Sequence, residues 1–125
     1  MTEGILLFVD DEEINLLLFK MSFSGHYKIM TTDSPLKALD MIKENDIKVV
    51  ISDYKMPNMN GMELIREIKK LKPEIICVIL SGYFETEVSI EREMIYKYVM
   101  KPWDKIDLIK IVNSAFNLYE TPNPA

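Results

Sequence analysis

The sequence predicts an α/β fold in which helices cover both faces of a parallel sheet. Five short apolar runs alternate with longer amphipathic segments, as repeated strand–helix units do. The third and fourth runs are apolar at nearly every position, which is typical of strands buried on both faces. A length of 125 residues fits one domain with one core. The expected strands span residues 5–9, 28–32, 47–52, 75–80 and 96–100.

Two of the intervening segments repeat apolar residues three and four positions apart, which predicts helices with one buried face. We expect both apolar stripes to pack against the sheet. The stripe of the first segment consists of Ile14, Leu17, Leu18 and Met21, and that of the third consists of Leu64, Ile65, Ile68 and Leu71.

The second helix is expected over residues 34–44. Ser34 is a good N-cap, and Pro35 suits the first helical position because no backbone N–H is needed there. A last helix is expected over residues 104–118, and its apolar arc covers about half of its circumference. Deep burial and contact with a partner both explain such an arc. The buried residues of the second helix are predicted to be Leu36, Leu39 and Ile42.

Charge and composition exclude several classes of function. Fifteen basic against twenty acidic residues give a net charge of −5, which disfavours direct binding of nucleic acid. The apolar runs are far shorter than the roughly 18 residues that a membrane span needs. The one cysteine, Cys77, lies in an apolar run, so we expect a buried thiol and a cytoplasmic location. Residues 1–120 are expected to form the domain, and residues 121–125 a polar tail or the start of a linker.

Acidic residues end two of the expected strands. Asp10 and Asp11 follow the first strand, and Asp53 follows the third. Because the carboxyl ends of parallel strands meet at one edge of the sheet, these side chains should lie together. Clustered carboxylates repel one another, and a Mg²⁺ ion with oxygen ligands relieves the repulsion. The sequence therefore predicts a magnesium site, although Asp10 and Asp11 alone also fit the N-terminal cap of the next helix.

A hydroxyl and an ammonium group are expected at the same edge. Ser81 ends the fourth strand, and Lys101 ends the fifth. Taken singly, Ser81 is typical of a turn and Lys101 of a solvated surface. Together with a carboxylate and a metal ion, they supply what phosphoryl transfer needs, which is a nucleophile, charge neutralisation and hydrogen bonds to phosphoryl oxygens.

The order of these residues along the chain resembles the receiver domain of two-component response regulators, and the resemblance covers nearly the whole chain. It includes Asp10-Asp11, Asp53, Ser81 and Lys101-Pro102. Residues 53–64, DYKMPNMNGMEL, are similar to that family's segment from the phosphoacceptor to the third helix. The resemblance implies a flavodoxin-like, doubly wound sheet of strand order 2-1-3-4-5.

The resemblance also implies a reaction. Asp53 is expected to accept a phosphoryl group from a phosphohistidine of a histidine kinase or a histidine phosphotransfer protein. Mg²⁺ is expected to bind Asp10, Asp11, Asp53 and the backbone carbonyl of Lys55. Lys101 is expected to pair with the phosphoryl oxygens, and the Lys101–Pro102 bond is expected to be cis.

In this family a hydroxyl moves toward the phosphoryl group and an aromatic ring rotates inward behind it. Ser81 and Tyr98 match these switch positions. Lys55 and Tyr83 match positions that tune dephosphorylation, and a cation beside a bulky ring predicts slow hydrolysis.

The change at the switch is expected to be read out on a fourth helix, the fifth strand and the last helix, a face that is also the expected homodimer contact. Only 20 residues separate Ser81 from Lys101, so the fourth helix is expected to lack about one turn.

Three other functions on similar folds need different residues. An aspartate-nucleophile phosphatase of the haloacid dehalogenase kind needs Asp-x-Asp, whereas this chain has Asp10-Asp11-Glu12. A flavin binder needs a phosphate loop rich in Ser, Thr and Gly, and acidic residues would repel the phosphate. An interaction module that is never phosphorylated needs none of the acceptor residues, yet all are present. We expect a regulatory switch without turnover of a diffusible substrate; whether the chain stands alone or is part of a longer protein stays open.

Overall fold

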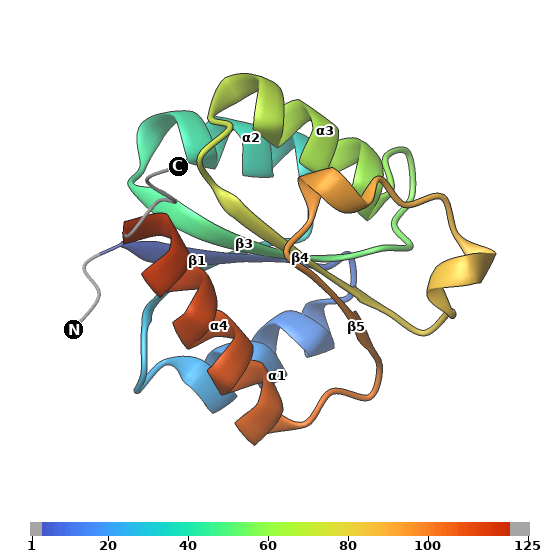
Figure 1. Ribbon diagram of the computed structural model, residues 1–125. Coiled ribbons are helices and arrows are strands. Elements are labelled where there is room, and N and C mark those ends of the chain that lie inside the picture. The colour runs from blue at the N-terminus through green and yellow to red at the C-terminus, as the bar shows by residue number, and fades with distance from the viewer. Residues whose placement is uncertain (1–3, 121–125) are drawn as a thin grey trace.

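The computed structural model describes residues 4–120 and contains one five-stranded sheet (Figure 1). The strand order is β2-β1-β3-β4-β5, and every neighbouring pair is parallel. The predicted fold class and strand order are therefore confirmed. The expected tail at residues 121–125 lies outside the described residues. The strands are β1 (Ile5–Val9), β2 (Lys28–Thr32), β3 (Ile47–Asp53), β4 (Ile76–Ser81) and β5 (Lys97–Met100).

Helices cover both faces of the sheet. In Figure 1, α2 and α3 lie on one face and α1 and α4 on the other. Each face has its own cluster of buried apolar side chains, so the molecule has three layers. Between residues 4 and 120, none of the helices is both long and apolar enough to cross a bilayer. The helices are α1 (Glu13–Phe23), α2 (Pro35–Glu44), α3 (Gly61–Leu71) and α4 (Lys105–Glu120).

The register of the strands brings their last residues to one edge of the sheet. Val9 of β1 pairs with Ser52 of β3, so the residues that follow them, Asp10 and Asp53, are neighbours. The central strands β3 and β4 are almost wholly buried, as their apolar sequences predict. Cys77 in β4 is buried as expected, and burial raises the pKa of its thiol to about 12.

Local capping interactions fix the helix that follows β3. The Asn60 side chain accepts a hydrogen bond from the Glu63 N–H at 2.8 Å, and the Glu63 carboxylate accepts one from the Asn60 N–H at 2.9 Å. Gly61 begins α3 so close to the sheet that a Cβ atom there would lie 2.5 Å from the backbone oxygen of Asp53. The start of α3 is thus packed directly against the end of β3.

The buried face of α1 differs from the prediction. The predicted stripe is exposed, and the buried side chains are Phe19 and Phe23. The Phe19 ring stacks on Phe8 of β1, with centroids 4.1 Å apart, and Phe23 lies against Trp103 at 5.4 Å. Large aromatic side chains bury more apolar area than leucines, so they occupy the core side. The exposed fractions are 59% for Ile14, 53% for Leu17, 51% for Leu18 and 70% for Met21.

Two smaller predictions about buried positions are also wrong. Leu36 lies in the first turn of α2 and is 68% exposed, because Ala38 and Ile42 form the buried face; Leu39 is partly buried. Leu71 is the last residue of α3 and is 42% exposed. The other predicted residues of α3 are buried.

The expected fourth helix does not form. Residues 82–96 contain two short 3-10 helices instead, Glu85–Glu87 and Arg92–Met94, so the helix labelled α4 is the last one. Val88 and Ile90 are β-branched residues, which are poor helix formers. An α-helix would also put the like charges of Glu87 and Glu91 four residues apart. Glu91 pairs instead with Arg66 of α3, which ties the segment to that helix.

Candidate functional site

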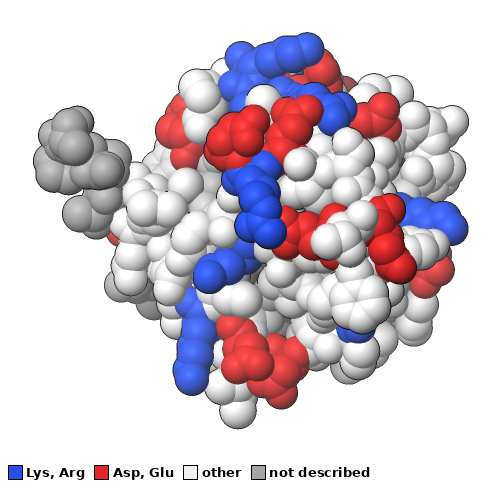
Figure 2. All heavy atoms as spheres, turned by 45° about the vertical axis from the view of Figure 1, so that its right-hand side comes forward, with Lys and Arg blue, Asp and Glu red and all other residues white. Residues whose placement is uncertain are grey.

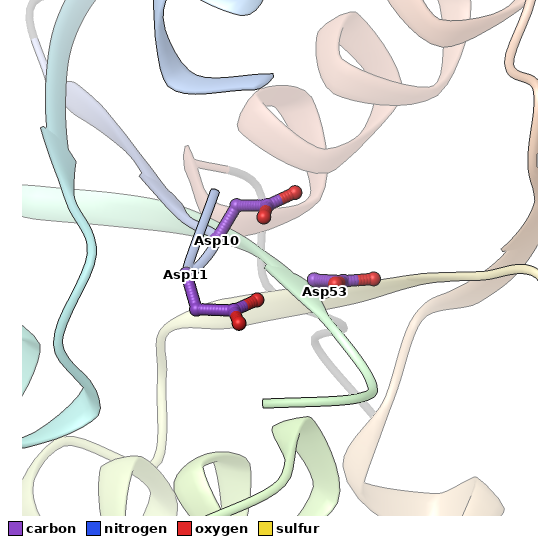
Figure 3. A group of neighbouring side chains, drawn as sticks. All are labelled: Asp10, Asp11 and Asp53. Carbon is purple, nitrogen blue, oxygen red and sulfur yellow. The ribbon is translucent and has the colours of Figure 1, made fainter. Parts of the chain in front are cut away.

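Carboxylates from two strands gather at the carboxyl edge of the sheet (Figure 3). Asp10 and Asp11 follow β1, and Asp53 is the last residue of β3. Each offers a carboxylate oxygen, and these oxygens all lie within 4.8 Å of one another. Asp10 and Asp53 are buried, whereas Asp11 is exposed. Such a set of oxygen atoms with an open side suits a hard divalent cation.

Hydrogen bonds hold Asp10 in place. Its Oδ1 accepts a hydrogen bond from the Glu12 N–H at 2.9 Å, and its Oδ2 accepts one from the Asn15 side chain at 3.1 Å. Burial raises the pKa of Asp10, and the Glu12 N–H partly opposes that shift while the charge of Asp53 adds to it. The site therefore disfavours the charged form of Asp10 despite the hydrogen bonds.

Asp53 is held by one strong partner. Lys101 Nζ lies 2.8 Å from Asp53 Oδ1 and 3.9 Å from Asp10 Oδ2. Burial raises the pKa of Asp53, and the hydrogen bond from Lys101 acts in the opposite direction. The ammonium group thus offsets part of the repulsion among the acidic residues. The Lys101–Pro102 bond is cis, as the sequence analysis predicts.

A surface hollow of about 610 Å³ opens above these groups. Asp53, Ser81 and Lys101 line it, and so do Lys55 and Tyr83. Figure 2 brings this side of the molecule forward and shows Lys and Arg side chains beside Asp and Glu side chains across the face. Asp11 and Glu12 line the hollow as well, so it offers acidic groups beside the two lysines.

Ser81 and Lys55 meet the same neighbour, Tyr83. Ser81 ends β4 and is buried, and its Oγ accepts a hydrogen bond from the Tyr83 N–H at 3.0 Å. Lys55 Nζ donates to Tyr83 Oη at 3.0 Å and lies 5.5 Å from the centre of the ring. That hydrogen bond raises the pKa of Lys55. Tyr98 of β5 also reaches this point, because its hydroxyl donates to the Tyr83 carbonyl at 2.6 Å.

Every candidate residue from the sequence analysis lies at or beside this edge of the sheet. Asp10, Asp11, Asp53 and Lys101 form the charged cluster, and Lys55, Ser81, Tyr83 and Tyr98 form a connected group next to it.

Sequence reasoning did not identify Asn15 or Gly61 as supports of the site. Asn15 follows Asp10 by five residues on the exposed start of α1, where an asparagine carries no distinctive signal. Gly61 reveals the close packing of α3 on β3 only once the distance between these two elements is known.

Known proteins share both the sequence pattern and the fold. A family model described as "Response regulator receiver domain" matches residues 6–113. The hydrogenase transcriptional regulatory protein HoxA of Cupriavidus necator is 28% identical over 90% of this chain, which spans 24% of HoxA. The DNA-binding transcriptional regulator NtrC of Klebsiella pneumoniae is 27% identical over 96% of this chain, which spans 26% of NtrC. The chain thus spans about a quarter of the length of these curated relatives.

The solved structures include receiver domains that align with this chain over nearly their whole length. A response regulator receiver domain protein from Clostridium thermocellum is 33% identical and has a TM-score of 0.87, and the alignment covers 94% of this chain and 97% of that one. The family model matches most of the chain, and the sheet order, the acidic cluster and these relatives agree with it. The chain belongs to the family of response regulator receiver domains.

Proposed function

We propose that the chain is a phosphoryl-accepting switch and that Asp53 is the acceptor. The observation that carries the proposal is the Asp53 carboxylate, which lies 2.8 Å from Lys101 on the floor of an open hollow. In the proposed reaction a carboxylate oxygen of Asp53 attacks the phosphorus of a phosphohistidine. The P–N bond breaks, the imidazole leaves with a proton, and an acyl phosphate forms on Asp53.

Two features favour Asp53 over its acidic neighbours as the nucleophile. Both oxygens of Asp10 already accept hydrogen bonds, one from the Glu12 N–H and one from the Asn15 side chain, so they are less free to attack. Among the described residues, Lys101 forms ion pairs with Asp53 and Asp10 and none with Asp11. Only the pair with Asp53, at 2.8 Å, is short enough for a hydrogen bond. Lys101 can follow the negative charge from the carboxylate to the phosphoryl oxygens.

The donor set fits Mg²⁺, which we propose as the cofactor. Carboxylate oxygens within 4.8 Å of one another, with open space above them, match a cation that keeps several water ligands. Asp10, Asp11, Asp53 and the backbone carbonyl of Lys55 would hold the ion. When bound, Mg²⁺ supplies neutralisation of the negative charges that meet during transfer.

Lys55 and Tyr83 are proposed to slow hydrolysis of the acyl phosphate. Their side chains contact each other at the rim of the hollow, where water must pass to reach a phosphoryl group on Asp53. An aromatic ring held by a cation restricts that path. We therefore expect a phosphorylated state that lasts well beyond seconds.

The exposed apolar stripe of α1 is proposed as the docking site for the protein that carries the phosphohistidine. The stripe begins at Ile14, just after the acidic residues Asp10 and Asp11, so a partner seated on it reaches the hollow. Soluble proteins rarely expose such a continuous apolar face without a binding role. A histidine kinase or a histidine phosphotransfer protein is the partner that the chemistry requires.

The output surface is proposed to comprise residues 82–96, β5 and α4. This surface differs from the face of fourth helix, fifth strand and last helix that the sequence predicts, because no α-helix forms between β4 and β5. Phe84 and Ile106 expose 65% and 66% of their surface there, which supports contact with a partner or a second copy. We propose no direct contact with nucleic acid, given the net charge of −5.

We propose a regulatory domain over residues 1–120 that does not turn over a diffusible substrate. A cytoplasmic location is proposed as well, because Cys77 is a free, buried thiol of the kind that persists in a reducing compartment.

Intact mass tests the proposed reaction. The protein is incubated with Mg²⁺ and acetyl phosphate, beside an Asp53→Asn variant and a sample with EDTA. We expect a single phosphoryl adduct in the wild type that requires metal and is absent from the variant. An equal adduct on Asp53→Asn, or no adduct on a wild-type protein whose circular dichroism shows an intact fold, would contradict the proposal.

A further inference from the structure

Tyr83 joins three residues of the site. Its N–H donates to Ser81 Oγ at 3.0 Å, and its carbonyl accepts from the Tyr98 hydroxyl at 2.6 Å. Its own hydroxyl accepts from Lys55 Nζ at 3.0 Å. The two backbone groups of Tyr83 are therefore bonded to side chains of the site rather than to a strand or helix.

Few other contacts hold Tyr83 itself, although the next residue, Phe84, is held in a 3-10 turn by two hydrogen bonds with Glu87. Gly82 precedes Tyr83 and has no atom of the protein within 4 Å of the place a Cβ would take, and Tyr83 belongs to no helix or strand. Tyr83 is 40% exposed, so packing holds it only in part. On the solvent side, Lys55 holds the Tyr83 side chain through a hydrogen bond to its hydroxyl and through the position of the ammonium group over its ring.

We propose that the contact between Lys55 and Tyr83 positions the Tyr98 side chain. While the contact is closed, the Tyr83 carbonyl stays in place as the acceptor for the Tyr98 hydroxyl. When the contact opens, that carbonyl moves, and the Tyr98 ring loses the one hydrogen bond from its hydroxyl among the described residues. Lys55 is thus a positioning residue that acts on Tyr98 through Tyr83.

The arrangement gives the hollow a direct link to β5. Lys55 and Tyr83 line the hollow above Asp53, and Tyr98 lies on the edge strand β5. A negatively charged group in the hollow competes with Tyr83 for the Lys55 ammonium and so changes how firmly Tyr98 is held. The signalling meaning of the link rests on the proposed function, whereas the contact exists in the unphosphorylated protein.

The size of the effect follows from the contacts. A cation over an exposed aromatic ring favours the closed arrangement by roughly 2- to 5-fold. Loss of the Lys55 ammonium should therefore lower the ratio of held to released Tyr98 by roughly that factor. If Lys55 and Tyr83 only cover the hollow, Tyr98 does not change when either is replaced.

The test measures Tyr98 directly in the absence of a phosphoryl donor. The protein is labelled with ¹³C on its six tyrosine rings, and the NMR signals of Tyr98 are assigned with a Tyr98→Phe variant. Lys55→Met removes the ammonium but keeps a similar stem, and Tyr83→Phe removes only the hydroxyl. Lys55→Arg keeps a cation that can donate to Tyr83. The matched control is Lys48→Met, because Lys48 lies 5.3 Å from the Tyr119 ring at the other end of β3.

We expect the Tyr98 signals to shift toward a released position in Lys55→Met and to a smaller extent in Tyr83→Phe, which loses the hydrogen bond but keeps the ring beneath the ammonium; the double variant should match Lys55→Met. Lys55→Arg should retain the wild-type signals, and Lys48→Met should leave Tyr98 unchanged. Unchanged Tyr98 signals in either Lys55→Met or Tyr83→Phe would overturn the inference. Because no donor is present, this result is independent of whether Asp53 accepts a phosphoryl group.

Discussion

Replacing Asp10 with asparagine should stabilise the metal-free protein. Asp10 is 1% exposed and lies within 4.8 Å of two other carboxylates, Asp11 and Asp53. Asparagine removes the negative charge and keeps an oxygen for the Glu12 N–H, which now donates at 2.9 Å. The change therefore removes repulsion and a buried charge, but it loses the hydrogen bond that the Asn15 side chain donates to the other oxygen of Asp10 at 3.1 Å.

The magnitude follows from the distances. Each neighbouring carboxylate repels Asp10 by about 1 to 3.5 kcal/mol for an effective dielectric constant between about 80 and 20. The attraction to Lys101, 3.9 Å away, offsets about one of these two contributions. The lost hydrogen bond from Asn15 costs about 1 kcal/mol, so the net gain from Asp10→Asn is at most about 2 kcal/mol, which corresponds to a Tm increase of at most roughly 8 °C for a domain of this size.

Thermal unfolding followed by circular dichroism checks this prediction in EDTA and in Mg²⁺. The variant should have the higher Tm in EDTA. Addition of Mg²⁺ should raise the Tm of the wild type more than that of the variant, because the variant has lost a ligand. Asp40→Asn on the exposed surface of α2 is the matched control and should stay within about 0.5 kcal/mol of the wild type. A lower Tm for Asp10→Asn in EDTA, or an equal gain from Mg²⁺, would refute the reasoning.

Four further changes have defined outcomes. Tyr83→Ala opens the rim of the hollow and should shorten the lifetime of the acyl phosphate several-fold, as followed by intact mass after the donor is removed. Leu17→Arg on the exposed face of α1 should slow transfer from a partner phosphohistidine roughly tenfold and leave reaction with acetyl phosphate unchanged, whereas Leu36→Arg on α2 should alter neither. Gly61→Ala puts a Cβ 2.5 Å from the Asp53 backbone oxygen and should lower the unfolding free energy in urea by about 1–3 kcal/mol. The raised pKa of Asp10 means that the folded state binds protons more readily than the unfolded state. Acidification from pH 7 should therefore stabilise the metal-free fold through this group and weaken the binding of Mg²⁺. Measurements of Tm against pH without and with Mg²⁺ check the two effects.

The sheet and the location of the site were predictable because they follow from local patterns and one rule of topology. Apolar runs mark the strands, and the carboxyl ends of parallel strands share one edge. Asp10, Asp53, Ser81 and Lys101 each end a strand or follow one, so their meeting required no knowledge of side-chain packing.

The faces of the helices were less predictable. Apolar residues spaced by three and four positions mark a helix face, but they do not tell whether the sheet or a partner covers it. In α1 the stripe that begins at Ile14 faces solvent, because the rings of Phe19 and Phe23 fill the core with greater area. Two phenylalanines four residues apart were the available signal for the buried side.

The segment between β4 and β5 depends on contacts that sequence spacing does not reveal. The family resemblance implied a helix there, whereas β-branched residues and the pairing of Glu91 with Arg66 favour two 3-10 turns. The contact between Lys55 and Tyr83 joins residues 28 positions apart and forms where the chain bends at Gly82 and Tyr83.

The most direct test of the central claim is to locate the phosphoryl group on the chain. The protein is phosphorylated with acetyl phosphate and Mg²⁺ and then treated with borohydride, which reduces an aspartyl phosphate to homoserine. Peptide mass spectrometry then identifies the modified residue. The account predicts homoserine at position 53 alone. Homoserine at Asp10 or Asp11, or a phosphoryl group that resists reduction because it sits on another kind of side chain, would contradict it.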